Sequence, residues 1–108
     1  MNTKDTKLNN SYSQTTVRFV IFKEEKTWYG VALEFNIVKE GDHALDVMRE
    51  LEEATITYFN TAKKNDLGLE ALNQEVDPEY EKRWQSAQSR KLLSDIFTAG
   101  VLQPALVA

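Results

Sequence analysis

The sequence contains no cysteine, which excludes disulfide scaffolds and thiolate sites for zinc or iron–sulfur clusters. Its four glycines are scattered, so no glycine-rich loop is available to hold a phosphate group. No apolar run approaches the roughly 18 residues of a membrane-spanning helix, and the polar residues 1–16 lack the apolar centre of a signal peptide. We therefore expect a cytoplasmic protein that does not span a membrane.

Histidine is also scarce, because His43 is the single one and any histidine-based catalysis would depend on it. Asp42 and Asp46 flank it, but a helix-start residue that bonds locally explains this pattern better than a metal ligand does. The serines have no base near them in the sequence, and the glutamates within residues 50–53 are typical of a solvated helix face. The sequence thus predicts a protein that is not an enzyme, with no catalytic residue, no metal and no cofactor.

Positive charge is in deficit, because 13 basic residues stand against 17 acidic ones and the net charge is −4. Phosphate neutralisation supplies most of the affinity of non-specific nucleic-acid binding, so this balance argues against a general polyanion binder. A local basic patch could still bind RNA despite the negative net charge of the chain. The basic pairs are not interleaved with aromatic residues, as a single-strand stacking platform would require. These pairs are Lys63-Lys64, Lys82-Arg83 and Arg90-Lys91.

What the sequence does have is enough apolar surface for one modest core, with 42% apolar and 28% charged residues in 108 positions. Residues rich in β-branched and aromatic side chains predict strands, and apolar steps of three and four residues predict helices. The predicted strands are residues 16–23, 28–35 and 37–40, and the predicted helices are residues 42–64 and 78–99.

Three segments follow from this pattern. Residues 1–14 are polar and are expected to form a flexible tail. Residues 15–77 are expected to fold as an α+β domain, with Asp42 or His43 capping the first helix. Residues 78–108 are expected to form a helix, capped by Asp77, and a short tail that serves for packing or oligomerisation.

Alternation along the strands predicts one strongly apolar sheet face, with Phe19 and Ile21 on the first strand and Val31 and Leu33 on the second. The first helix should cover this face. The opposite face is too apolar for water, and either the C-terminal helix or a second copy of the chain should cover it. The C-terminal helix has more apolar surface than this face needs, and pairing of two chains would bury the excess. We therefore expect a homodimer. Its expected interface residues are Val20, Phe22, Trp28, Trp84, Leu93 and Phe97.

The segment from Trp28 to Ala54 resembles the HicB-like antitoxin domain. Residues 32–38 read Ala-Leu-Glu-Phe-Asn-Ile-Val, which is similar to the family's strand segment, and Gly41-Asp42 matches the turn before its helix. Residues 51–54, Leu-Glu-Glu-Ala, match a later helix turn, and residues 17–23 stand where the family's first strand belongs. The resemblance implies a small antiparallel sheet in β-β-β-α order, of partial RNase H-like type, with an additional C-terminal helix here.

The chain departs from the family at several positions. His43 stands where a threonine is usual, Ala44-Leu45 replaces an acidic pair, and the family's fourth strand is not evident after the first helix. The C-terminal part is neither a helix-turn-helix nor a ribbon-helix-helix motif, so we expect no sequence-specific DNA binding.

Three functions remain open. The first, implied by the resemblance, is a non-enzymatic module that binds a small RNA-cleaving toxin, and an acidic module suits a basic partner. The second is an RNA-binding protein, because the β-β-β-α order is similar to double-stranded-RNA-binding architecture. The third is a domain that associates with itself or binds a small ligand.

Overall fold

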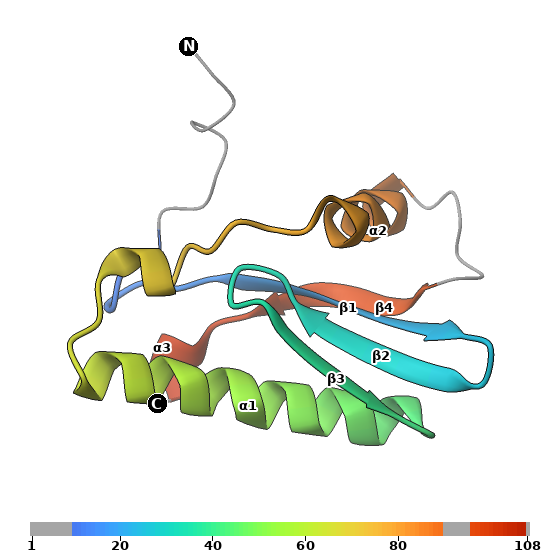
Figure 1. The fold of residues 1–108 in the computed structure, drawn as a ribbon, viewed down its shortest axis with the longest axis horizontal. Helices are drawn as coiled ribbons and strands as arrows, with labels where there is room; N and C mark the ends of the chain where they lie inside the picture. Colours follow the sequence, from blue (N-terminus) through green and yellow to red (C-terminus); the bar gives the residue numbers. More distant parts are fainter. Residues whose placement is uncertain (1–9, 90–95, 108) are drawn as a thin grey trace, which may run out of the picture.

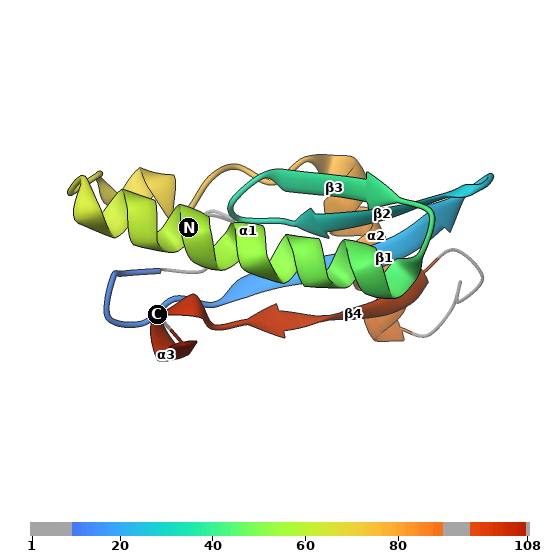
Figure 2. The same cartoon turned by 90° about the horizontal axis from the view of Figure 1, so that it is seen from below.

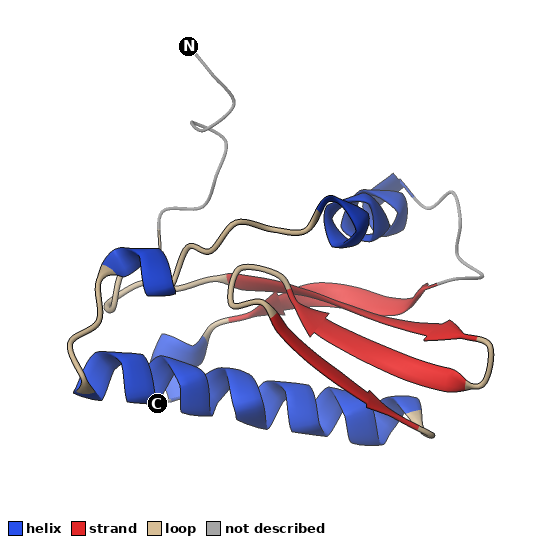
Figure 3. Ribbon diagram, viewed as in Figure 1, coloured by secondary structure: helices blue, strands red, loops and turns tan. Residues whose placement is uncertain are grey.

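A four-stranded antiparallel sheet forms the centre of the molecule, with helices on both of its faces (Figures 1 and 3). This computed structural model describes residues 10–89 and 96–107. The expected α+β class is confirmed, and the strands lie in the order β3-β2-β1-β4. The strands are β1 (Val17–Glu24), β2 (Thr27–Ala32), β3 (Ile37–Gly41) and β4 (Ile96–Leu102). The helices are α1 (Ala44–Lys64), the short 3-10 helix η2 (Leu69–Ala71), α2 (Pro78–Ser89) and α3 (Pro104–Val107).

A tight turn joins β1 to β2 and determines which side chains share a face of the sheet. Glu24 lies opposite Thr27, and Glu25 in the turn between them has a positive φ of 56°. This short connection places even-numbered residues of β1 opposite odd-numbered residues of β2, as with Phe22 and Tyr29. Residues directly opposite one another point to the same face of the sheet.

The expected assignment of faces was therefore wrong for β2. Val31 and Leu33 lie in one apolar cluster with Val20 and Phe22, whereas Phe19 belongs to the cluster on the other face. Alternation within each strand was correct, but it leaves the register between two strands undetermined. A change of one residue in the turn would exchange the faces.

Helix α1 packs on the face that carries Phe19 and Ile21. It forms because apolar residues recur at three- and four-residue steps and make one buried stripe. The helix approaches the sheet most closely at Gly30, where an added Cβ would lie 2.8 Å from Val47 Cγ1. The expected side-chain cap is not formed, since His43 is the N-cap residue and makes no capping hydrogen bond with its side chain. The buried residues of the stripe are Val47, Leu51, Thr55, Phe59 and Ala62.

Helix α2 covers the opposite face of the sheet, so of the two covers expected from the sequence it is the C-terminal helix, and not a second copy of the chain, that lies there. Phe22 is only 3% exposed and packs with Tyr80 and Trp84 of α2. The helix begins as expected, because Asp77 Oδ1 accepts a hydrogen bond of 2.8 Å from the backbone N–H of Glu79. The sheet is thus a layer between α1 and α2 (Figure 3).

The chain ends differently from the prediction of one helix over residues 78–99. Helix α2 ends at Ser89, and Ile96–Leu102 is the edge strand β4, which pairs antiparallel with β1. Its residues Ile, Phe, Thr and Val favour a strand, but their spacing also continues the apolar stripe of the preceding helix. Pairing with β1, more than 70 residues earlier in the sequence, decides between the two. Consequently residues 78–102 contribute both a helix and a strand to the same layered structure as residues 15–77.

Part of the expected N-terminal tail is anchored to the rest of the chain. Asn10 is 4% exposed, and its side-chain Nδ2 donates hydrogen bonds to the backbone oxygens of Leu72 and Thr16. The ring of Tyr12 packs against that of Phe59 in a tilted arrangement, with ring centroids 5.8 Å apart. The prediction of a flexible tail over residues 1–14 is therefore wrong for residues 10–14, whereas residues 1–9 lie outside the described part.

Candidate protein-binding surface

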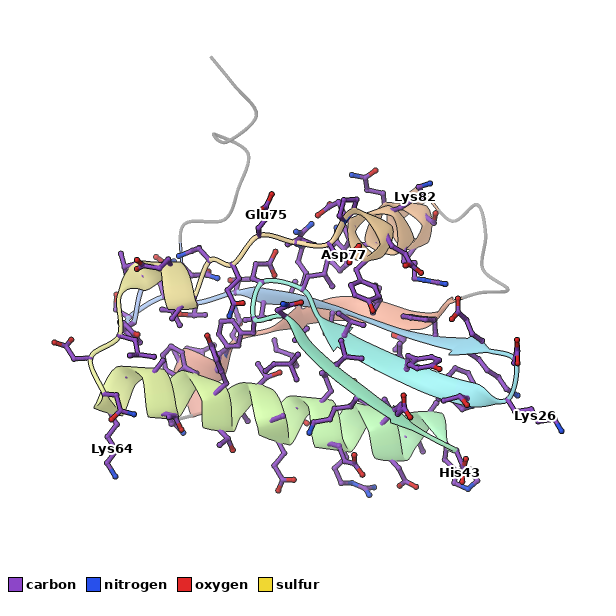
Figure 4. The ribbon with its side chains drawn as sticks, viewed as in Figure 1. Lys26, His43, Lys64, Glu75, Asp77 and Lys82 are labelled. Carbon is purple, nitrogen blue, oxygen red and sulfur yellow. The ribbon has the colours of Figure 1, made fainter. Side chains whose placement is uncertain are left out.

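His43 is the residue for which a catalytic or metal-binding role was considered. His43 is exposed in the turn between β3 and α1, at the rim of the molecule (Figure 4). Over residues 10–89 and 96–107, no group of three histidine, aspartate or glutamate side chains is placed to hold a metal ion. In the same part of the chain, no helix has the length and apolarity needed to cross a membrane.

The basic residues do not gather into one patch within the described structure. Lys26, Lys64 and Lys82 lie at three separate corners of the molecule (Figure 4). Arg83 is engaged with Glu24 at 2.5 Å, and the pair Arg90-Lys91 lies outside the described residues. This distribution offers no continuous groove for a nucleic-acid backbone.

A polar cluster centred on Arg18 joins α2 to the sheet. Arg18 donates from Nη1 and Nη2 to the two carboxylate oxygens of Glu81, both at 2.8 Å. Its Nε donates to Glu34, which is 4% exposed. These hydrogen bonds from Arg18 hold the pKa of the Glu81 carboxyl below its ordinary value. The guanidinium also lies 5.6 Å from the ring of Trp84, so its groups are taken up within the fold.

The residues expected to form a dimer interface are mostly used inside the chain. Val20 and Phe22 are buried beneath α2, and Trp84 faces the same cluster from the helix. Trp28 packs against the cluster on the α1 side. Leu93 and the side chain of Phe97 lie outside the described residues. At its four described residues, the expected interface therefore lacks the exposed apolar surface on which it depended, while self-association itself stays a prediction.

The two edges of the sheet are the places where a partner can add a strand. Strand β3 forms one edge and β4 the other (Figure 2). Val38 on β3 is 46% exposed, and its neighbours Lys39 and Glu40 are charged. An edge strand leaves alternate backbone N–H and C=O groups without a strand partner, which makes it a template for pairing.

Acidic side chains follow the exposed side of α1 next to the β3 edge. Asp46, Glu50 and Glu53 are all exposed and recur at steps of four and three residues, so they lie on one side of the helix. Asp42 precedes them in the turn from β3, and Leu45 among them is 71% exposed. Val38 lies opposite Val31, so its side chain is on the face that α2 covers, whereas Leu45 and the acidic residues are on the α1 side. We call the edge of β3, with Val38 on one side of it and Leu45 and these acidic residues on the other, the β3–α1 surface. It combines backbone groups, apolar contacts and negative charge.

Sequence reasoning placed only the glutamates within residues 50–53 on a solvated helix face, and it did not identify Val38 or Leu45. Nothing in the sequence distinguishes these two apolar residues from others. The strand order places Val38 on an edge strand, and the structure shows that Leu45 is exposed. One feature of the sequence could have indicated that residues 37–41 form an edge strand. This is the charged pair Lys39-Glu40 after Val38, since charged residues are common on edge strands.

A scan of protein-family models and searches of curated proteins and of solved structures gave no match to this chain.

Proposed function

We propose that this chain is a non-enzymatic, HicB-like binding module of the cytoplasm whose partner is a small basic protein, an RNA-cleaving toxin. The observation that carries the proposal is the β3–α1 surface, where an open strand edge lies beside a row of exposed carboxylates. The resemblance of residues 28–54 to the HicB-like domain supports it, because this segment supplies β3 and the first half of α1.

The chemistry of the surface favours a basic protein over a nucleic acid. A partner strand would gain main-chain hydrogen bonds along β3, and Val38 would contact its side chains. The carboxylates of Asp46 and Glu50 would attract lysine and arginine residues, which raises the association rate more than the affinity itself. The same carboxylates repel phosphate groups, so RNA binding is the weaker proposal.

The test takes the protein encoded by the gene adjacent to that of this chain. Both proteins are produced together, and the adjacent protein alone is tested for growth arrest and for RNA cleavage. We expect the adjacent protein to be basic, to cleave RNA, and to lose that activity when one equivalent of this chain is added. An adjacent protein that neither binds this chain nor cleaves RNA contradicts the proposal, and so does retention of RNA by this chain in a salt-sensitive manner.

Charge reversal then maps the surface. Asp46→Lys combined with Glu50→Lys should slow association by about tenfold and make it less sensitive to salt. Glu75→Lys is the matched control for the single variant Glu50→Lys, because both change the net charge by the same amount. Glu75 is also exposed but lies on the α2 side of the sheet, away from α1 (Figure 4). Equal effects of Glu75→Lys and Glu50→Lys would show that net charge, and not the β3–α1 surface, governs binding.

A further inference from the structure

The other edge of the sheet has a different chemistry from β3. Residues 96–108 contain no aspartate, glutamate, lysine or arginine, in a chain of which 28% is charged. This is the longest uncharged run of the sequence, and it includes the whole of β4. Edge strands usually carry charged residues that prevent unwanted pairing, as Lys39 and Glu40 do on β3.

The structure places this uncharged run where it is open to a neighbour. One side of β4 pairs with β1, in a register that sets Arg18 opposite Val101 and Phe19 opposite Gly100. No strand lies on its other side within residues 10–89 and 96–107. Val101 is 49% exposed, and Leu106 in the following helix α3 is 76% exposed. Backbone groups and apolar side chains are thus available together at this edge.

We propose that β4 pairs antiparallel with β4 of a second copy of this chain, about a twofold axis, so that the two sheets join into one. The net charge of the chain favours a second copy, and not a basic protein, as the partner of β4. Two copies that each carry a net charge of −4 repel one another over most of their surfaces, and least where neither copy has a charge. The uncharged β4 edge offers no electrostatic attraction to a basic protein. A basic protein is attracted to the acidic residues of the β3–α1 surface instead.

The backbone geometry agrees with a twofold arrangement. Antiparallel pairing of a strand with its own copy lets each chain donate and accept the same hydrogen bonds, which is the form of an isologous interface. The small residues Thr98, Ala99 and Gly100 keep the centre of β4 free of bulky side chains. The two Val101 side chains come to lie on the same face of the joined sheet. This dimer differs from the one expected from the sequence, because it uses a strand edge and not the face beneath α2.

The experiment is sedimentation of the full chain from micromolar to hundreds of micromolar concentration. We expect the wild-type protein to approach twice the 12.4 kDa mass of one chain. Val101→Lys should raise the dissociation constant of the dimer at least about tenfold, because each copy then brings a positive charge into an edge that otherwise carries none. Val38→Lys is the matched control, with a residue of the same type and nearly equal exposure, 46% against 49%, on the opposite edge strand. It should leave the dimer unchanged.

A second pair of variants keeps the test independent of folding defects. Val101→Glu should also dissociate the dimer, and an equimolar mixture of the Val101→Lys and Val101→Glu proteins should restore it, since the joined edge then carries charges of opposite sign. A wild-type protein that stays monomeric throughout overturns the proposal. So does a dimer that Val38→Lys dissociates as strongly as Val101→Lys, or a mixture of the two charged variants that remains monomeric. The association of this chain with a basic protein is unaffected by any of these outcomes.

Discussion

The carboxylate of Glu34 accepts two hydrogen bonds from Arg18, one from its backbone N–H at 2.9 Å and one from its Nε at 2.6 Å. Glu34 lies in the turn after β2, and Arg18 lies near the start of β1. The remaining guanidinium nitrogens of Arg18 reach Glu81 on α2. One arginine therefore links β1, the turn after β2, and the helix that covers them.

Arg18→Met should destabilise the protein by about 3 kcal/mol, because it leaves a buried carboxylate at Glu34 without its cationic partner. Urea denaturation followed by circular dichroism measures the change. Arg49→Met is the control, since Arg49 and Asp46 form an exposed pair at 3.4 Å that contributes little. Similar losses of stability in the two variants would mean that the buried pair of Arg18 and Glu34 contributes no more to stability than the exposed pair does.

Stability should fall in acid partly through Glu81. Its folded-state pKa is lowered from 4.5 by the hydrogen bonds from Arg18, so the folded state binds this proton more weakly than the unfolded chain does. The stability that Glu81 contributes is therefore fully present above about pH 4.5 and is lost as the pH falls through the lower, folded-state pKa.

The measurement for Glu81 is the urea midpoint between neutral pH and about pH 3. Glu81→Gln should lower stability near neutral pH and flatten its decline in acid, because the variant has no carboxylate to protonate. A decline in acid as steep as that of the wild type would assign the pH dependence to other carboxylates.

Gly30→Ala should cost about 1–3 kcal/mol, because the new methyl group would lie 2.8 Å from Val47 Cγ1 and 2.9 Å from Ile21 Cδ1. Thermal and urea unfolding report the loss. Gly68→Ala serves as the comparison, since a Cβ there would meet only the exposed side chain of Glu70, which is free to rotate away. A Gly30→Ala protein as stable as the Gly68→Ala protein would show that α1 shifts to make room.

Asn10→Ala should destabilise the protein by about 2–3 kcal/mol, although Asn10 precedes every helix and strand. Its side chain accepts a hydrogen bond of 2.8 Å from the N–H of Thr16 and donates one of 2.9 Å to the oxygen of Leu72, and the substitution leaves these groups without a partner. Ser13→Ala, at an exposed position in the same segment, should change stability by less than about 0.5 kcal/mol. Equal stability of the two variants would remove the anchoring role of Asn10.

The elements that depend on local patterns could be predicted from the sequence. The β-branched residues of β1, the apolar steps of α1 and the start of α2 at Asp77 and Pro78 all act on their own neighbours. Three features could not be predicted, because each depends on a contact distant in sequence. These are the faces of β2, the strand formed by Ile96–Leu102, and the burial of Asn10 against Leu72.

The candidate surfaces were predictable to a smaller extent. The acidic row of α1 could be recognised from its spacing, but its significance comes from the edge strand beside it. The expected interface failed at Val20 and Phe22 because α2 belongs to the same chain and covers them, which no local pattern indicates. The uncharged character of residues 96–108 is visible in the sequence, yet it has meaning only once that segment is an edge.

The pairing of β1 with β4 has a consequence for the order of folding during synthesis. Val17 at the start of the sheet finds its partner only in Leu102, roughly 80 residues later. At about 5 to 20 residues per second, a nascent chain waits at least about 4 s for that partner. During this interval one margin of β1 carries unsatisfied backbone groups, and a ribosome-bound chaperone or a neighbouring nascent chain can occupy it. The pairing of β1 with β4 therefore forms after β1 and β2 can pair, because β4 is synthesised later.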